Sequence, residues 1–400
     1  MRQDRAAHSG TLVKEDEILQ WLLVGTRTEL SIEKIFVDLC VKLASSGLPL
    51  ARASLHFRTH NPEWLGSRIL WQAAILGCRT ESVAYEVEET TAFTLSPFKT
   101  IIDGADEVRQ HLEKALPGSK EYPIYTGLRT EGLTDYIALP LDHTGDRRHL
   151  VTFLSDVPGG FRSQHISTLR GLLPALALVT EIRLKNQLAK TLLDTYVGPR
   201  AGNQILEGVT RRGSGATVNA GIMMCDLRNF TALSCKLSRD ETISLLNGYF
   251  DALAEPIQAN GGEILKFMGD GVLAIFPLEN VTICQAMIRA IDEARVSLAA
   301  MNERNLESGR TVVGYGIGVH VGEVMYGNIG SRNRLDFTVI GPAVNTASRI
   351  EGLAKELKCT VLCSDAFVRL AGCQDRSEYM GNHLLRGIDE PIGVYSLFRE

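Results

Sequence analysis

The chain has 400 residues, of which 44% are hydrophobic and 22% are charged, and its formal net charge is −5. This length exceeds the usual size of a single domain, so two domains with separate cores are expected. Nucleic-acid-binding proteins usually carry a concentrated basic surface. A slightly acidic chain gives no sign of one, and we expect no nucleic-acid partner.

The N-terminal segment and the longest apolar run argue against a membrane segment. MRQDRAAHSG lacks the apolar stretch of a signal peptide, and residues 171–182 contain Pro174 and are too few to span a bilayer. We therefore expect a cytoplasmic protein without a membrane span. The eight cysteines are scattered and form no CxxC motif, even at Cys359 and Cys363, so reduced structural thiols are expected.

The first 160 residues show helical and then strand-like patterns. Two helical patterns lie within residues 17–46, and Ser31 followed by Glu33 is a suitable start for the second helix. Strands are expected at residues 51–57, 68–76 and 83–89, and a hairpin is expected to join residues 136–141 and 149–154 across the turn-rich segment 142–148. Residues 1–160 are therefore predicted to form an α+β domain.

The order of these elements and the segment GLRTEGLTDYIALPL resemble a GAF-type sensor module, a family of ligand-binding and dimerising domains. Another α+β sensor of PAS-like shape has a similar element order, so this alternative stays open. The resemblance implies a small ligand for residues 1–160 but does not identify it.

A long helical pattern at residues 162–196 follows, with an expected kink or interruption at Pro174. Its end is predicted at Gly198 and Pro199. The helix carries a leucine every four residues, at Leu184, Leu188 and Leu192. This stripe could pair with its copy in a dimer or pack on the sensor domain, and both interpretations remain open. We assign residues 161–213 to the last sensor helix and the linker.

Residues 214–400 are predicted to form a second α+β domain. The expected elements are a strand at 218–225, a helix at 241–258, a hairpin at 263–276, a helix at 281–305 and a strand at 311–320. This βαββαβ order matches a ferredoxin-like sheet with helices on one face.

Two aspartates stand where strands of this domain end. Asp226 follows the apolar run 221–225, and Asp270 lies in the predicted hairpin turn. If the strands are neighbours, the two carboxylates converge. Paired hard oxygen ligands with open coordination positions suit Mg²⁺ or Mn²⁺ in phosphoryl-transfer enzymes. Either aspartate alone is more simply explained as a turn residue.

Four segments resemble the signatures of the class III nucleotide cyclases, in the order and spacing of that family. They are CDLRNFTALS, EILKFMGDGVLAIF, GIGVHVGEVMYGNIGS and TVIGPAVNTASRIEGLAK. Four linked motifs across one domain are far more specific than a single glycine pattern. The resemblance implies conversion of a nucleoside triphosphate into a cyclic nucleotide and pyrophosphate.

The resemblance also implies roles for the residues around the aspartates. Asp226 and Asp270 would bind two metal ions, Mg²⁺ or Mn²⁺, with help from the backbone carbonyl of Leu227. Amides at Phe230 and Thr231, at a helix start, would receive the terminal phosphates. The proton of the attacking 3′-hydroxyl could leave to Asp226, to substrate or to water.

Asn345 and Arg349 are four residues apart in a helix that Pro342 is predicted to open, so they share one face. By resemblance, Asn345 orients the ribose and Arg349 stabilises charge on the α-phosphate. Arg334 and Arg386 match positions at which the family places basic residues near the triphosphate. Without the surrounding motifs, a solvent-exposed Asn and Arg would be the simpler interpretation.

By the same resemblance, Lys266 and Thr338 occupy the positions that contact the base. Lys266 can donate to adenine N1, and the Thr338 hydroxyl can accept from N6. Guanylate cyclases of the family carry an acidic residue in place of this lysine, so ATP is the expected substrate.

In this family the residues of one site come from two chains. All of them are present here, so a homodimer with two equivalent sites at its interface is expected. A guanylate cyclase and a catalytically weak nucleotide-binding regulator are the alternatives. Diguanylate synthesis is a poorer match, because GGEIL at Gly261 is only a partial echo of the acidic turn that it requires.

Overall fold

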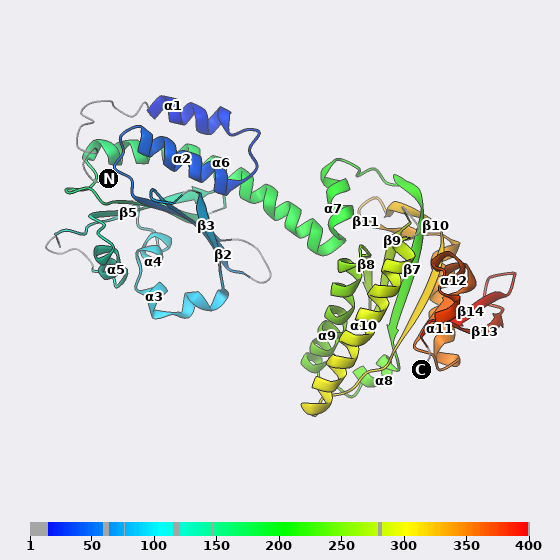
Figure 1. The fold of residues 1–400 in the computed structure, drawn as a ribbon. Helices are drawn as coiled ribbons and strands as arrows, with labels where there is room; N and C mark the ends of the chain where they lie inside the picture. Colours follow the sequence, from blue (N-terminus) through cyan, green and yellow to red (C-terminus); the bar gives the residue numbers. More distant parts are fainter. Residues whose placement is uncertain are drawn as a thin grey trace. The chain divides into compact units, whose positions relative to one another are not determined.

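A computed structural model describes residues 15–58, 64–75, 77–114, 121–145, 147–278 and 282–398. It separates into two compact units, Met1–Thr191 and Leu192–Glu400 (Figure 1). Each unit combines helices with a sheet, so the chain is of mixed α+β class. The expected boundaries at residues 160 and 213 remain predictions.

The first unit contains a six-stranded antiparallel sheet in the order β3-β2-β1-β6-β5-β4. The predicted hairpin is confirmed, because β5 and β6 pair along their whole length. The strands are β1 Arg52–Arg58, β2 Gly66–Gln72, β3 Cys78–Val83, β4 Val108–His111, β5 Asp135–His143 and β6 Arg147–Ser155.

Helices cover both faces of this sheet, and alternate strand residues enter two different cores. Ile137 and Phe153 join the core under α1, α2 and α6, whereas Tyr136 and Leu154 join the core under α4 and α5. Ser31 caps α2, as predicted, by accepting a hydrogen bond from the amide of Lys34. The helical segments are α1 Glu15–Gln20, π-helical Trp21–Gly25, α2 Ile32–Ser45, 3-10 Tyr85–Glu89, α3 Thr91–Thr94, α4 Pro97–Ile102, α5 Ile124–Thr130 and α6 Ser163–Val197.

One expectation for this part of the chain is wrong, and one of the two alternatives at Pro174 is excluded. The strand expected at residues 83–89 is a 3-10 turn, because β2 already pairs with Cys78–Val83 and completes the sheet edge before Tyr85. Helix α6 is not interrupted at Pro174. Pro174 and Arg170, whose carbonyl loses its helical partner, are both exposed, so solvent can satisfy that carbonyl.

The second unit contains an eight-stranded sheet in the order β13-β14-β12-β10-β7-β9-β8, with β11 paired to β10. The strand expected at residues 311–320 is observed as β10 at Tyr315–Gly330, so the prediction placed both its start and its end too early. The strand continues beyond residue 320 because it pairs with β7 over thirteen positions. The strands are β7 Gly215–Leu227, β8 Glu263–Met268, β9 Gly271–Pro277, β10 Tyr315–Gly330, β11 Leu335–Ile340, β12 Val361–Ser364, β13 Glu378–His383 and β14 Ile392–Ser396.

The two faces of this sheet are covered by different helices. Helices α9, α10 and α12 bury one face, which carries Met223 and Cys225 of β7, and Figure 1 shows α9 and α10 side by side. Helices α7 and α11 pack on the other face, which carries Ile222. The helices are α7 Pro199–Leu206, α8 Phe230–Ser234, α9 Arg239–Ala259, α10 Thr282–Glu307, α11 Pro342–Glu356, α12 Asp365–Ala371 and the 3-10 turn Gln374–Arg376.

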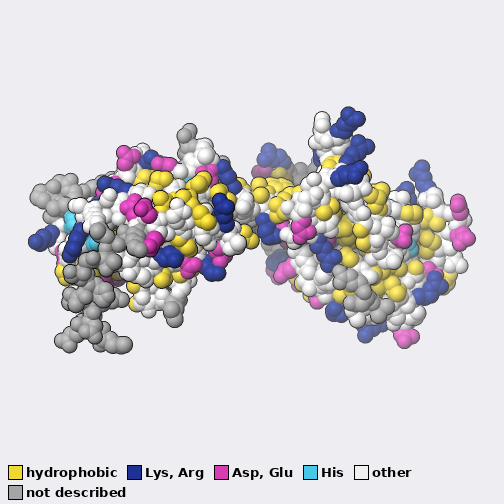
Figure 2. Space-filling view, turned by 90° about the horizontal axis from the view of Figure 1, so that it is seen from above, with side chains coloured by type: hydrophobic (Ala, Val, Ile, Leu, Met, Phe, Trp, Pro, Cys, Tyr) yellow, Lys and Arg dark blue, Asp and Glu magenta, His cyan; other side chains and the backbone are white. Residues whose placement is uncertain are grey.

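Figure 2 shows acidic and basic side chains interspersed over most of the face that it presents. Among the described residues, no helix has the length and apolarity needed to cross a membrane. All eight cysteines are free thiols, and Cys359 and Cys363 lie after α11 and within β12.

Candidate functional site

The two predicted metal-binding aspartates converge at the hairpin between β8 and β9. Asp226 is the penultimate residue of β7, not a residue beyond the strand as expected, and β7 pairs with β9 up to Cys225 and Val272. This register puts Asp226 level with Gly271. A Cβ atom added at Gly271 would lie 3.5 Å from Asp226 Oδ1. Asp270 occupies the adjoining turn, and its carboxyl group is close enough to perturb the titration of Asp226.

The electrostatics of this pair follow from burial and like charge. Burial and the nearby Asp270 and Glu351 carboxylates raise the pKa of Asp226 to about 7. The nearby guanidinium of Arg228 does not bind the pair: it donates to the carbonyls of Tyr315 at 3.0 Å and Cys359 at 2.5 Å. In the part of the chain that the structure describes, Arg228 therefore does not neutralise the two carboxylates.

This donor set fits divalent cations. Two converging carboxylates next to the backbone of Leu227 offer hard oxygen ligands, and a bound cation would relieve the repulsion that raises the pKa of Asp226. The described residues contain no cluster of three or more His, Cys, Asp or Glu side chains that could enclose a metal. The pair is therefore an open site, with coordination positions left for other ligands.

The residues predicted to receive phosphates follow β7 directly. Asn229 adopts a left-handed conformation with φ of 59°, and helix α8 begins at Phe230 and continues with Thr231. The first amides of a helix have no partner inside it, so they can donate to an anion. The turn thus brings two such amides close in sequence to Asp226.

Helix α11 packs unusually close to β10. At Gly318 a Cβ atom would lie 2.3 Å from the backbone nitrogen of Glu351, so only glycine permits this approach. The helix buries Ala347 and Ile350 and leaves Asn345 and Arg349 exposed on its opposite side. The structure therefore places the two predicted catalytic residues on one solvent-facing side of α11.

The two predicted base-contacting residues lie near each other, with a third residue that the sequence analysis missed. Lys266 of β8 forms an ion pair with Asp336 of β11, with 2.6 Å between Nζ and Oδ2. Thr338 follows two residues later, on the same side of β11 as Asp336, and is buried. The ion pair lowers the pKa of Asp336. We call Lys266, Asp336 and Thr338 the base cluster, after the predicted contact with the nucleotide base.

The two other predicted arginines are in exposed loops. Arg334 ends the turn between β10 and β11, where its carbonyl accepts from the amide of Ser331 at 2.8 Å. Arg386 lies between β13 and β14. The structure brings Arg334 within two residues of the base cluster and does not join Arg386 to it.

Comparison with known proteins assigns this unit to a family. The sequence model of the adenylate and guanylate cyclase catalytic domain matches residues 214–397. The same part is 35% identical over 191 residues to an adenylate cyclase of Anabaena cylindrica, covering 46% of this chain and 38% of that protein. Residues 214–397 belong to the adenylate and guanylate cyclase family.

Two further similar proteins are also named as nucleotide cyclases. Adenylate cyclase 1 of Rhizobium meliloti is 31% identical over 179 residues, which cover 44% of this chain and 27% of that protein. The crystal structure of the guanylyl cyclase Cya2 is 31% identical, covers 45% of this chain and 92% of that chain, and gives a TM-score of 0.41. The match to the two curated adenylate cyclases spans well under half of their length.

Within the cyclase domain, Asp336 and Glu351 are the residues near the site that sequence reasoning missed. Asp336 had a readable signal, since residues two apart in a strand point to the same side and Thr338 was already singled out. Glu351 had none, because its approach to Asp226 depends on how closely α11 packs on Gly318.

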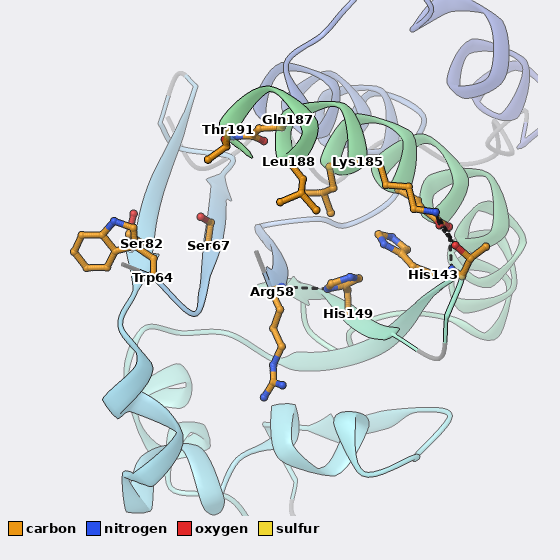
Figure 3. Close-up of a pocket in the computed structure, with 13 residues that line it drawn as sticks. Arg58, Trp64, Ser67, Ser82, His143, His149, Lys185, Gln187, Leu188 and Thr191 are labelled. Atoms are coloured by element: carbon orange, nitrogen blue, oxygen red, sulfur yellow. Dashed lines mark hydrogen bonds and ion pairs between the residues drawn. The ribbon is translucent and has the colours of Figure 1, made fainter. Parts of the chain in front are cut away.

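The first unit holds a separate polar cavity of about 250 Å³ beneath the later turns of α6 (Figure 3). Here the sheet presents Ser67, Ser82, His143 and His149, while Leu188 of α6 lies opposite them and Leu184 also lines the cavity. The imidazole rings of His143 and His149 are in contact, with centroids 4.3 Å apart. The cavity therefore has a polar floor and a partly apolar roof.

His143 is held by a hydrogen bond between its Nε2 and the Thr180 hydroxyl, 3.1 Å apart. The Thr180 hydroxyl also lies 2.8 Å from the carbonyl of Leu176, to which it can donate. Burial lowers the pKa of His143. The charges at the cavity are already paired, Lys185 with Glu181 at 2.6 Å and Arg58 with Glu88.

Proposed function

We propose that the chain is an adenylate cyclase that converts ATP into 3′,5′-cyclic AMP and pyrophosphate. In this reaction the ribose 3′-hydroxyl loses its proton and its oxygen bonds to the α-phosphorus, while the bond to the β-phosphate oxygen breaks. The observation that carries the proposal is the converging pair Asp226 and Asp270 on a domain that also presents Lys266 in the base cluster. A ferredoxin-like core for residues 214–400 is part of the same proposal.

Asp226, Asp270 and the carbonyl of Leu227 would hold two Mg²⁺ or Mn²⁺ ions. When bound, these ions would supply positive charge that neutralises the triphosphate and acidifies the attacking hydroxyl. The amides of Phe230 and Thr231 would donate to the terminal phosphates. These groups bind and orient the triphosphate, which is the larger part of catalysis in phosphoryl transfer.

Asn345 would orient the ribose, and Arg349 would stabilise the charge that develops on the α-phosphate. A guanidinium suits this role because it presents several donors in one plane. Their exposure on one side of α11 leaves both side chains free to meet a substrate. Arg334 and Arg386 are the candidates for further contacts with the phosphates.

The base cluster favours ATP. An ammonium at Lys266 donates to adenine N1, while guanine presents a donor at that position, so the pairing would be lost. The ion pair with Asp336 holds Lys266 in place and adds a second acceptor beside Thr338 for the N6 amino group. A carboxylate accepts but does not donate, and this complements the hydroxyl of Thr338, which does both.

A homodimer would complete each site. Exposed apolar side chains flank the base cluster and the aspartates: Phe267 is 51% exposed, Met268 45% and Ile340 47%. Helix α6 also exposes Leu178, Ile182, Leu192 and Tyr196. A second copy that covers these surfaces would bring Asp226 of one chain to Asn345 of the other around a two-fold axis.

The first unit, a GAF-like sensor by its element order, would regulate this assembly. The cavity beneath α6 suits a small neutral molecule, because its charged groups are already paired and its serine and histidine side chains can form hydrogen bonds. A ligand that prefers one position of α6 would shift the population of active dimers. Filling the cavity with Ser67→Trp is expected to change the cyclase rate of the full chain, whereas Ser163→Trp, at the exposed start of α6, leaves it unchanged.

The direct test is to incubate the purified chain with ATP or GTP and with Mg²⁺ or Mn²⁺, and to identify the products by mass spectrometry. We expect cyclic AMP and pyrophosphate in equal amounts. Equal or greater formation of cyclic GMP would favour the guanylate cyclase alternative. No cyclic product with either nucleotide would favour a nucleotide-binding regulator.

A further inference from the structure

A buried carboxylate joins the start of α7 to the sheet of the cyclase domain. Glu263, the first residue of β8, is 6% exposed. Both of its carboxylate oxygens lie within hydrogen-bond distance of the Tyr326 hydroxyl, at 3.0 and 2.9 Å, and the amide of Ala201 also donates to the carboxylate. Burying a carboxylate is costly unless donors surround it, so these contacts hold Glu263 in one place.

The geometry of the α6–α7 corner matches this contact. Helix α6 ends at Val197, Gly198 has φ of 91°, and Pro199 begins α7. A Cβ atom on Gly198 would lie 3.2 Å from Glu263 Oε1 and would strain a backbone in this conformation. Ala201 is the third residue of α7 and is fully buried, so Glu263 caps the positive end of this helix from a neighbouring strand.

The same contacts lead to the base cluster. The ring of Tyr326 meets that of Phe337 edge-on, with centroids 4.8 Å apart, and Phe337 stands between Asp336 and Thr338 in β11. Asp336 in turn binds Lys266, three residues after Glu263 in β8. The chain of contacts from Glu263 through Tyr326, Phe337 and Asp336 thus returns to the strand on which it began.

A cavity shows how close the corner lies to the base cluster. Its volume is about 750 Å³, and residues 194–200 at the end of α6 and the start of α7 line it together with Lys266 and Asp336. A shift of the corner would change the walls of this cavity and the direction of Lys266. Helix α6 begins in the first unit and ends at this corner, so the corner is the point at which the linker helix meets the cyclase domain along the chain.

We propose that Glu263 and Tyr326 are positioning residues: they lock the α6–α7 corner to β8 and thereby hold Lys266 in the direction that the nucleotide base requires. This inference rests on the proposed function and adds to it two residues that touch neither metal nor substrate. It also gives the linker helix a physical connection to substrate affinity.

The decisive variant is Tyr326→Phe, which removes the hydroxyl but keeps the ring against Phe337. We expect the KM for ATP to rise about five- to tenfold with kcat nearly unchanged, because the net free energy of a typical hydrogen bond corresponds to a change of this size in an equilibrium constant. Amide hydrogen exchange in residues 199–206 and 263–268 should become faster. The matched control is Tyr379→Phe, which removes an exposed hydroxyl that donates to Asn382 at 2.9 Å on β13, and it should change none of these quantities.

Glu263→Gln and Glu263→Ala separate positioning from general destabilisation. Glutamine keeps the size and an acceptor, so its KM should lie between those of the wild type and the alanine variant. A loss of kcat at constant KM in Tyr326→Phe, or unchanged exchange in α7 and β8, would overturn the proposal. If the unmodified chain forms no cyclic nucleotide, the proposed function fails, yet the exchange comparison still decides whether the lock exists.

Discussion

The sheets of the two units differ in how their faces are covered. In the first unit, helices with separate buried cores lie on both faces. In the second, α9, α10 and α12 close one face, while α11 on the other face leaves Asn345 and Arg349 exposed on its outer side. The first sheet is therefore covered by its own chain, and we infer that the second carries a face that a second copy completes.

The largest expected effect concerns the carboxylates on this open face. Asp226→Ala and Asp270→Ala should each reduce cyclic AMP formation about a thousandfold or more, because each removes a ligand from both cations. Asp251→Ala, on the exposed side of α9, is the control and should keep wild-type activity. Substantial activity in either site variant, measured with Mn²⁺ at saturating ATP, would contradict the assignment of the metal site.

A charge at the exposed apolar residue Ile340, which follows the base cluster in β11, should separate the copies. Ile340→Asp is expected to convert the dimer to monomers and to lower activity about ten- to a hundredfold, since it would bury an unpaired carboxylate in the interface. Val296→Asp, which changes a 67% exposed residue of α10, should do neither. Sedimentation equilibrium and the rate at one protein concentration test both variants. If both stay dimeric, the surface around Ile340 is not the interface.

The base cluster should set the choice of nucleotide. Lys266→Glu combined with Thr338→Cys is expected to lower the ratio of kcat/KM for ATP to that for GTP about tenfold or more, because a site that loses its hydrogen-bond partner discriminates less. Lys236→Glu, in the exposed loop after α8, should not alter this ratio. A double variant with an unchanged ratio would remove the base-reading role from these positions.

A smaller effect concerns the first unit, whose stability should fall as the pH is lowered. Burial lowers the pKa of His56 in the first unit from 6.5 to about 3, so its contribution to stability is complete above pH 6.5 and is lost as the pH falls through the range between these values. At pH 5 the loss should be about 2 kcal/mol in the free energy of unfolding.

His56→Gln should flatten this dependence between pH 7 and pH 5, as measured by denaturant unfolding followed on signals of the first unit. His165→Gln, at a less buried position in the first turn of α6, should leave most of it in place. An equal dependence in the wild type and His56→Gln would show that other groups carry the acid sensitivity.

Local patterns predicted much of the cyclase domain. The hairpin that presents Asp270 could be read from alternating apolar residues around a Gly-Asp-Gly turn, and the common side of Asn345 and Arg349 follows from helical spacing. The extent of β10 could not be read, because its four interior glycines suggest loop until the close packing of α11 on Gly318 is known.

Contacts between segments that are far apart in the sequence could not be predicted either, because they depend on how the segments pack. Asp336 is 70 residues from Lys266, and Tyr326 is 63 residues from Glu263, so neither pair leaves a periodic signal. Glu263 even interrupts the apolar pattern of its strand, and its burial makes sense only once Ala201 and Tyr326 are in place. Sequence reasoning thus found the residues of the motifs and missed those that hold the motifs together.

Mixing two inactive variants tests most directly whether each active site is formed by residues of two chains. Asp226→Ala and Asn345→Ala chains, allowed to exchange subunits in equal amounts, should recover about a quarter of wild-type activity, because half of the dimers contain one intact site of two. A mixture of Asp226→Ala with Asp270→Ala should recover none, since both changes damage the same half of every site. Exchange without recovery in the first mixture, or recovery in the second, would contradict a site shared between two chains.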